Sequence, residues 1–190
     1  MHPEINPGDV ALLRSQGMSE EDLAHSVAVA ELALDVARRT GAPLDMELVA
    51  RGALFHDLGK VATHAIEHGL IGAKMGRELG LPPEVCAVME KHIRGGLSPE
   101  EAVELGLPVK DYALERLEER VIIYADRLVD IITEGMAALR GPAEAEERFD
   151  EILKAYPKYG KNDATMARYF GYHREIQGLI RAARHGGVPV

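Results

Sequence analysis

Apolar residues recur at helical spacing along most of this chain, and that periodicity restricts its fold more than any other feature. The clearest stripe lies in the segment 19–39 and has a period of about 3.6 residues, with the members Leu23, Val27, Ala30, Leu34 and Ala37. No window alternates between apolar and polar residues as a half-buried strand does, and no hairpin dipeptide joins alternating runs. The sequence therefore predicts an all-α fold with many short helices.

Capping and breaking residues divide the periodic pattern into separate helices. Ser19 and Asp45 are typical N-caps, and the stretch 98–101 (Ser-Pro-Glu-Glu) has the form of a capping box. Glycines follow several of the apolar stripes, as they do at helix C-termini. We expect helices over residues 10–16, 19–39, 45–59, 66–79, 83–93, 114–133, 143–155 and 162–184, with a further short one beginning at Ser98.

The composition restricts the compartment and the partners of the protein. The chain has 190 residues, enough for one domain with an appendage. Its formal net charge is -9, which disfavours binding to a nucleic-acid polymer or to an anionic membrane. The single cysteine, Cys86, excludes an internal disulfide and fits a reducing compartment. We see no signal peptide and no apolar run near the ~20 residues of a membrane span, so we expect a cytoplasmic protein.

Polar residues occur at several positions where the periodicity predicts burial. His56 and Asp57 end the apolar run of the stretch LFHDLGK (54–60), and His25 lies on an apolar stripe of its own helix. His92 continues an apolar face, and Asp126 lies on the apolar stripe of the segment 114–133. A buried carboxylate costs several kcal/mol unless it is paired or binds a metal. Because such groups occur on four separate helices, we expect them to share one partner.

The chemistry of these side chains is that of a metal site. Imidazoles and carboxylates without thiolates suit Fe, Mn, Zn, Ni or Mg-like divalent ions and not a structural thiolate zinc site. His56 and Asp57 are adjacent at a helix end, so both can turn toward one centre. Asp57 has two carboxylate oxygens and could bridge two ions roughly 3.5–4 Å apart.

The ordered set of residues over about 20–135 resembles the HD-domain superfamily of metal-dependent phosphohydrolases. The stretch 56–59 (His-Asp-Leu-Gly) is close to the HDIG variant of that family, with leucine in place of isoleucine. His68 and His92, with their neighbours, resemble the additional histidines of the two-metal branches. No Gly-Tyr-Pro follows the motif, which disfavours the cyclic-di-GMP hydrolase branch, and the spacing resembles that of small stand-alone HD proteins.

The resemblance implies both a fold and a reaction. It implies an HD-like helical bundle over residues 1–140, with a C-terminal helical extension over 141–190 packed on it. It also implies hydrolysis of a phosphoester or phosphoanhydride, in a nucleotide or a similar phosphorylated small molecule, by a bridging water that two cations acidify. The implied ligands are His25, His56, Asp57 and Asp126 for the first metal, and Asp57, His68 and His92 for the second.

Other residues receive less direct roles. Lys60 is expected to bind phosphate or assist the leaving group, and Arg94 is a second candidate for binding phosphate. His64 is expected at an outer position or on the substrate side, and Arg127 at the surface or just outside the ligands. Tyr169 and Tyr172 are expected to pack against the core, with stacking on a nucleobase as the alternative.

Two other functions are compatible with the same residues. Some two-iron HD proteins are oxygenases, so the metals could serve oxidation rather than hydrolysis. The domain could also bind a nucleotide as a sensor, with metals that serve only structure. The aromatic residues near the C-terminus make a homodimer an additional expectation.

Overall fold

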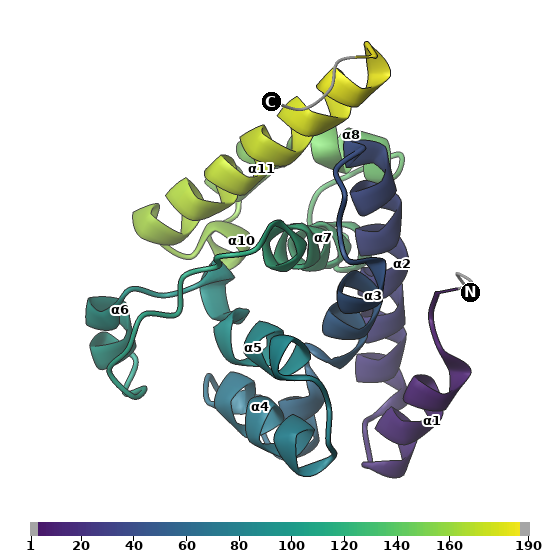
Figure 1. Cartoon of the computed structure of the whole chain (residues 1–190). Helices are drawn as coiled ribbons and strands as arrows, with labels where there is room; N and C mark the ends of the chain where they lie inside the picture. The colour runs from purple at the N-terminus through teal and green to yellow at the C-terminus, as the bar shows by residue number, and fades with distance from the viewer. Residues whose placement is uncertain (1–3, 187–190) are drawn as a thin grey trace.

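The computed structural model describes residues 4–186, and every regular element within that range is helical (Figure 1). The predicted all-α fold is therefore confirmed. The helices are α1 (Pro7–Ser15), α2 (Glu20–Thr40), α3 (Met46–Phe55), the 3-10 helix η1 (Leu58–Val61), α4 (His68–Glu78), α5 (Pro83–Lys91), the 3-10 helix η2 (Ile93–Gly95), α6 (Pro99–Glu104), α7 (Leu117–Thr133), α8 (Pro142–Glu147), α9 (Phe149–Ala155), α10 (Pro157–Gly160) and α11 (Asp163–Arg184).

Helices α2, α3 and α7 pack against one another at the centre of the molecule (Figure 1). Their facing residues are fully buried aliphatic side chains, such as Val29 of α2, Leu54 of α3 and Ile122 of α7. Helix α2 begins where predicted, because the Ser19 side chain accepts a hydrogen bond from the Asp22 amide at 3.0 Å. His25 lies on α2, Asp126 on α7, and the His56–Asp57 pair directly follows α3, so all four residues lie beside the core.

Helix α4 approaches the segment after α3 so closely that only glycine fits at the contact. A Cβ added to Gly59 would lie 1.9 Å from the backbone oxygen of His68. One added to Gly72 would lie 2.8 Å from the Gly59 backbone nitrogen. The two backbones therefore touch directly, and this contact holds His68 beside the His56–Asp57 pair.

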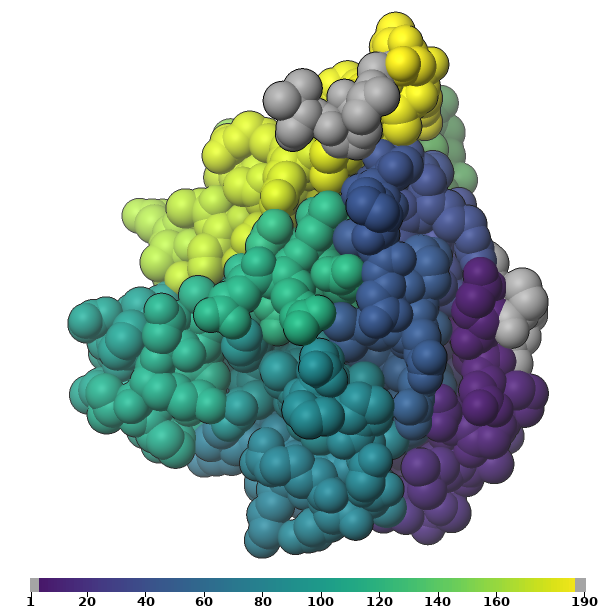
Figure 2. All heavy atoms as spheres, viewed as in Figure 1, coloured from purple at the N-terminus to yellow at the C-terminus, as the bar shows by residue number. Residues whose placement is uncertain are grey.

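The C-terminal helices share the core of the rest of the chain. Phe149, Tyr159, Tyr169 and Ile176 are fully buried within the same hydrophobic cluster as the residues of α2, α3 and α7. Figure 2 shows α11, in yellow, lying directly against the segments coloured blue and green. The described helices before and after residue 140 contribute to one hydrophobic core. A division of the chain into two parts at this residue therefore stays a prediction.

Several predicted helix boundaries are wrong. The first helix begins at Pro7 rather than at Val10, and the helix predicted from residue 114 begins at Leu117. The third helix ends at Phe55 rather than near Gly59, because the His56 ring bonds the Ala53 carbonyl and the chain continues as a 3-10 turn. The segment 143–155 forms two helices, since Arg148 leaves helical geometry (φ -98°, ψ 12°) and turns the chain so that Phe149 enters the core. Within residues 4–186, no helix is long and apolar enough to cross a membrane.

Candidate metal and phosphate site

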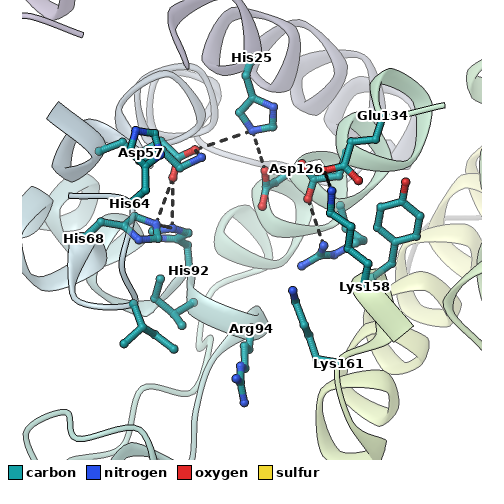
Figure 3. A pocket seen from close by; sticks show the side chains of 16 residues that line it. His25, Asp57, His64, His68, His92, Arg94, Asp126, Glu134, Lys158 and Lys161 are labelled. Atoms are coloured by element: carbon teal, nitrogen blue, oxygen red, sulfur yellow. Dashed lines mark hydrogen bonds and ion pairs between the residues drawn. The ribbon is translucent and has the colours of Figure 1, made fainter. Parts of the chain in front are cut away.

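Six predicted site residues lie together, and all of them except His56 line one cavity of about 540 Å³ (Figure 3). They come from α2, the end of α3, α4, the end of α5, and α7: His25, His56, Asp57, His68, His92 and Asp126. His56, Asp57 and His92 are buried, and the other three are partly exposed toward the cavity. Residues up to 101 positions apart in the sequence thus meet at hydrogen-bond distance.

The six side chains form two groups, and in each the potential ligand atoms lie within 4.8 Å of one another. The first group is His25, His56 and Asp126, in which His25 Nε2 is 3.0 Å from Asp126 Oδ1. The second group is Asp57, His68 and His92. Each group offers three nitrogen or oxygen donors of the kind that divalent transition metals prefer.

Asp57 contacts both groups through different oxygens. Its Oδ2 atom is 3.2 Å from His56 Nε2 and 3.8 Å from His25 Nε2. Its Oδ1 atom is 3.3 Å from His68 Nε2 and 3.4 Å from His92 Nε2. The carboxylate therefore lies between the two groups, in the arrangement that a bridging ligand of two metal ions requires.

Backbone carbonyls determine which ring nitrogen faces the cavity. The Nδ1 atoms of His56, His68 and His92 each lie 2.7 Å from a carbonyl oxygen three residues earlier in the chain. A carbonyl only accepts, so each Nδ1 must carry the proton that it donates. In the neutral rings, Nε2 is then left with a lone pair directed at the site.

These lone pairs have no protein donor to meet. His68 Nε2 and His92 Nε2 lie 2.9 Å apart, although both are acceptors in this tautomer. His56 Nε2 is buried and lies 3.2 Å from Asp57 Oδ2, which can only accept, so a proton or a cation must lie between these two atoms. Two facing acceptors repel unless a proton or a metal cation lies between them, so the donor set fits divalent cations.

The carboxylates make the site strongly attractive to positive charge. Burial works against a charged His56 ring, but Asp57 and Asp126 outweigh it and hold the pKa of His56 well above its usual value. Burial also opposes ionisation of Asp57, yet the neighbouring histidines hold its pKa well below the usual range. Burial and the nearby His68 and His56 lower the pKa of His92, which keeps that ring neutral.

The structure also locates the three predicted substrate-side residues. The Lys60 ammonium is 2.5 Å from Asp57 Oδ2, and this carboxylate raises the lysine pKa against the opposing effect of burial. His64 belongs to neither ligand group and is an exposed residue on the cavity lining, 3.8 Å from Asp22 Oδ2. Arg94 lines the same cavity.

Several cavity residues were missed by the sequence analysis, and one of the two positions expected for Arg127 is excluded. Arg127 is not at the surface: its side chain is buried, lines the cavity, and donates to Asp130 Oδ2 at 3.0 Å and to Tyr169 Oη at 3.2 Å. Lys158 and Lys161 line the cavity from the C-terminal segment. Their local sequence has no motif that marks them, because only the docking of α10 brings them to the site.

The two tyrosines proposed for base stacking do not line this cavity. Tyr169 is fully buried against Arg127, whose guanidinium lies 5.0 Å from the ring centroid. The Tyr172 hydroxyl donates to the Gly95 carbonyl at 2.8 Å. Both therefore pack between α11 and the rest of the chain, and the aromatic residue on the cavity lining is Tyr159.

Comparisons with known proteins identify relatives of this arrangement. The uncharacterized protein MJ0778 of Methanocaldococcus jannaschii is 38% identical over 167 residues, which is 86% of this chain and 92% of that protein. The tRNA (cytidine(56)-2'-O)-methyltransferase of Thermoplasma volcanium is 40% identical over 173 residues, which is 91% of this chain but 47% of the methyltransferase.

A solved structure shares the fold. It is the HD domain of the phosphodiesterase PgpH of L. monocytogenes in complex with cyclic-di-AMP, with a TM-score of 0.53 at 18% identity over 97% of this chain and 98% of that one. The model of the HD domain family matches residues 22–131, a span that runs from helix α2 to helix α7 and includes the adjacent His56 and Asp57. This protein therefore belongs to the HD domain family.

Proposed function

We propose that this protein is a metal-dependent phosphohydrolase that cleaves a phosphoester or phosphoanhydride bond of a nucleotide or related small molecule. The observation that carries the proposal is the pair of facing His68 and His92 Nε2 atoms, 2.9 Å apart beside the carboxylate of Asp57. Such a set of acceptors is suited to hold divalent cations and little else.

Two divalent cations, when bound, would supply Lewis acidity toward a phosphoryl oxygen and toward water. The protein side chains would hold the cations, and the backbone orients these side chains. Backbone carbonyls fix the orientation of His56, His68 and His92, so that their Nε2 atoms are directed at the site without rearrangement. Asp57 is suited to join the two positions, with Lys60 as its counterion.

The cavity itself supports a small phosphorylated substrate. Its volume of about 540 Å³ lies within the range of ~300–1,000 Å³ that is usual for small-molecule sites. Lys60, Arg94 and Lys161 line it with positive charge, which attracts phosphate. The PgpH HD domain binds cyclic-di-AMP, which supports a nucleotide as the substrate here.

The methyltransferase relative does not imply methyl transfer by this chain. The matched region is 47% of the Thermoplasma volcanium protein and 91% of this chain. We infer that the methyl transfer of that relative belongs to the part of it that this chain does not match.

The test combines metal analysis with hydrolysis. We expect protein purified without chelator to contain close to two equivalents of transition metal by plasma mass spectrometry, and to hydrolyse at least one member of a nucleotide panel. Asp57→Asn should lose more activity than the roughly 10- to 100-fold that removal of an outer partner of a metal ligand costs. Asp163→Asn, at an exposed carboxylate that does not line the cavity, is the matched control.

Three outcomes would contradict the proposal. Full activity in Asp57→Asn would exclude the bridging role. Oxygen consumption by a two-iron form without phosphate release would favour an oxygenase. Retention of an unhydrolysed nucleotide through purification, with no turnover on the panel, would favour a sensor.

A further inference from the structure

Two cavity residues have a backbone conformation that side chains rarely adopt. Among residues 4–186, the non-glycine residues with positive φ are Arg94 (φ 51°) and Lys161 (φ 60°). Both are basic, both line the cavity of the HD site, and they come from segments 67 positions apart in the sequence. Positive φ is costly for residues with a side chain, and such costs concentrate at ligand-binding positions.

Ion pairing distinguishes this pair from the neighbouring cations of the cavity. Neither Arg94 nor Lys161 forms an ion pair within the described part of the chain, whereas the neighbouring Lys158 is 2.8 Å from Glu134 Oε1. Arg127 is likewise paired, with Asp130. Burial and the repulsion of Arg127 and Arg94 lower the pKa of Lys161, so the two free cations lie near enough to disfavour each other.

The backbone of Arg94 is held in place by helix α11. The Arg168 guanidinium donates to the Arg94 carbonyl from Nε at 3.4 Å and from Nη2 at 3.3 Å, and it is itself fixed by two hydrogen bonds to Glu101. The Tyr172 hydroxyl donates to the next carbonyl, that of Gly95. These hydrogen bonds hold the Arg94 backbone in one conformation without a ligand. Less conformational entropy is therefore lost when a ligand binds.

Lys161 is fixed in a different way, between two helices. It is the C-cap of α10, and its amide donates to the Pro157 carbonyl at 2.8 Å. The next residue, Asn162, is the N-cap of α11 and accepts a hydrogen bond from the Thr165 amide. Figure 3 shows Lys161 and Arg94 beside each other, on the opposite side of the cavity from His25 and Asp57.

We propose that Arg94 and Lys161 form a second anion subsite, which binds a phosphate group of the substrate other than the one cleaved at the histidine–aspartate groups. The substrate class would then be nucleotides with two separated phosphates, such as dinucleotides or nucleoside bisphosphates. This inference rests on the proposed hydrolase function for the first phosphate. Two cations without an ion-pair partner among residues 4–186, set beside each other in one cavity wall, are an arrangement that favours an anionic ligand.

The experiment uses two ligands that differ by one anionic group and resist hydrolysis. One is adenosine with methylene phosphonates at both the 3′ and 5′ positions, and the other has only the 5′ phosphonate. Calorimetric titration of the Mn-loaded protein should give at least about tenfold tighter binding of the bisphosphonate, the size expected of a charge-assisted contact. Arg94→Ala and Lys161→Ala should each remove most of this difference, so that the two ligands bind the variants with affinities within about twofold of each other.

Lys154→Ala is the matched control, because Lys154 is an exposed lysine of α9 that does not line the cavity. It should leave both titrations unchanged. Equal affinity of the wild-type protein for the two ligands, or equal loss of both ligands in the variants, would overturn the subsite. Hydrolysis of unmodified nucleotides is measured in parallel. Hydrolysis without tighter binding of the bisphosphonate would support the proposed function and contradict the subsite. Tighter binding of the bisphosphonate without hydrolysis would support the subsite and contradict the proposed function.

Discussion

Single hydrogen bonds between histidine rings and backbone carbonyls prepare this site for cations. His56, His68 and His92 each give their Nδ1 proton to a carbonyl three residues earlier. The same local contact is repeated at three separate helix ends, two of them C-caps. Each one removes the choice of tautomer and directs Nε2 toward the ligand position. The orientation of these three rings is therefore determined by interactions within four residues of sequence.

His92→Gln should change metal stoichiometry rather than abolish metal binding. The variant removes one of three donors of the second group, whereas His25, His56 and Asp126 of the first group remain. We expect the metal content to fall from about two equivalents to about one, as measured by plasma mass spectrometry. His185→Gln, at an exposed ring outside both groups, should keep the full content. Two equivalents in both variants would remove His92 from the ligand set.

Lys161→Gly should stabilise the protein while weakening its function. The native φ of 60° with ψ of -74° is unfavourable for any residue with a Cβ, and such strain costs on the order of 1–3 kcal/mol. Part of that gain is offset because glycine is more disordered in the unfolded chain. We expect thermal unfolding to shift upward in Lys161→Gly and not in Lys161→Ala, which keeps the strain. An unchanged midpoint in both variants would show that the backbone here is not strained.

At the scale of whole elements, the contact between η1 and α4 depends on the absence of two side chains. A Cβ at Gly59 would lie 1.9 Å from the His68 carbonyl oxygen and 2.7 Å from the Gly72 amide nitrogen. These atoms belong to backbone and cannot rotate away, so the helix itself would have to move. The same helix carries His68, which means that this packing contact also sets the geometry of the second ligand group.

Gly59→Ala should therefore destabilise the protein by about 3 kcal/mol or more, the upper range for overpacking. Gly178→Ala is the matched control, because a Cβ there meets nothing within 4 Å and the position is inside helix α11. The control should be neutral or stabilising by up to about 1 kcal/mol. Urea unfolding of the three proteins gives the comparison, and similar stability of Gly59→Ala and wild type would contradict the close contact.

The sequence predicts N-caps better than it predicts exact helix boundaries and cavity walls. Ser19 and Asp45 cap their helices as expected, since an N-cap is a local hydrogen bond that residue type reveals. The sequence predicts an end of α3 near Gly59, but the helix ends at Phe55. No local sequence rule reveals that the His56 ring forms a hydrogen bond with the Ala53 carbonyl. Polar residues in apolar stripes reveal His25, His56, His92 and Asp126. His68 is found only through the family resemblance, and Lys161 has neither signal.

At the scale of the whole molecule, buried polar contacts join the C-terminal helices to the core. Glu146 of α8 accepts from Arg39 of α2 and from Gln177 of α11. Gln177 also donates to the Tyr124 hydroxyl at 3.4 Å, and that hydroxyl lies 2.9 Å from His173 Nδ1. The buried phenol stays protonated because burial raises its pKa, so it donates to the ring. His173 must then present an unprotonated Nδ1, and the ring stacks on Phe149.

This contact predicts that stability falls in mild acid. Burial lowers the pKa of His173 in the folded state, whereas the unfolded chain keeps the usual value near ~6.5. As the pH drops below that value, the unfolded state takes up the proton first. The free energy of unfolding therefore decreases with falling pH, from about 6.5 down to the folded pKa, by less than the roughly 1.4 kcal/mol per pH unit of one full proton.

Urea unfolding at pH 7.5 and at pH 5.5 measures this effect. His173→Gln should be less stable than wild type at pH 7.5, because the packing on Phe149 is lost, but it should lose less stability on acidification. His185→Gln provides the comparison, since that exposed ring at the end of α11 should leave the pH dependence of wild type unchanged. Equal loss of stability in His173→Gln and wild type would assign the acid sensitivity to other groups, and α11 would then be held to the core without a titrating contact.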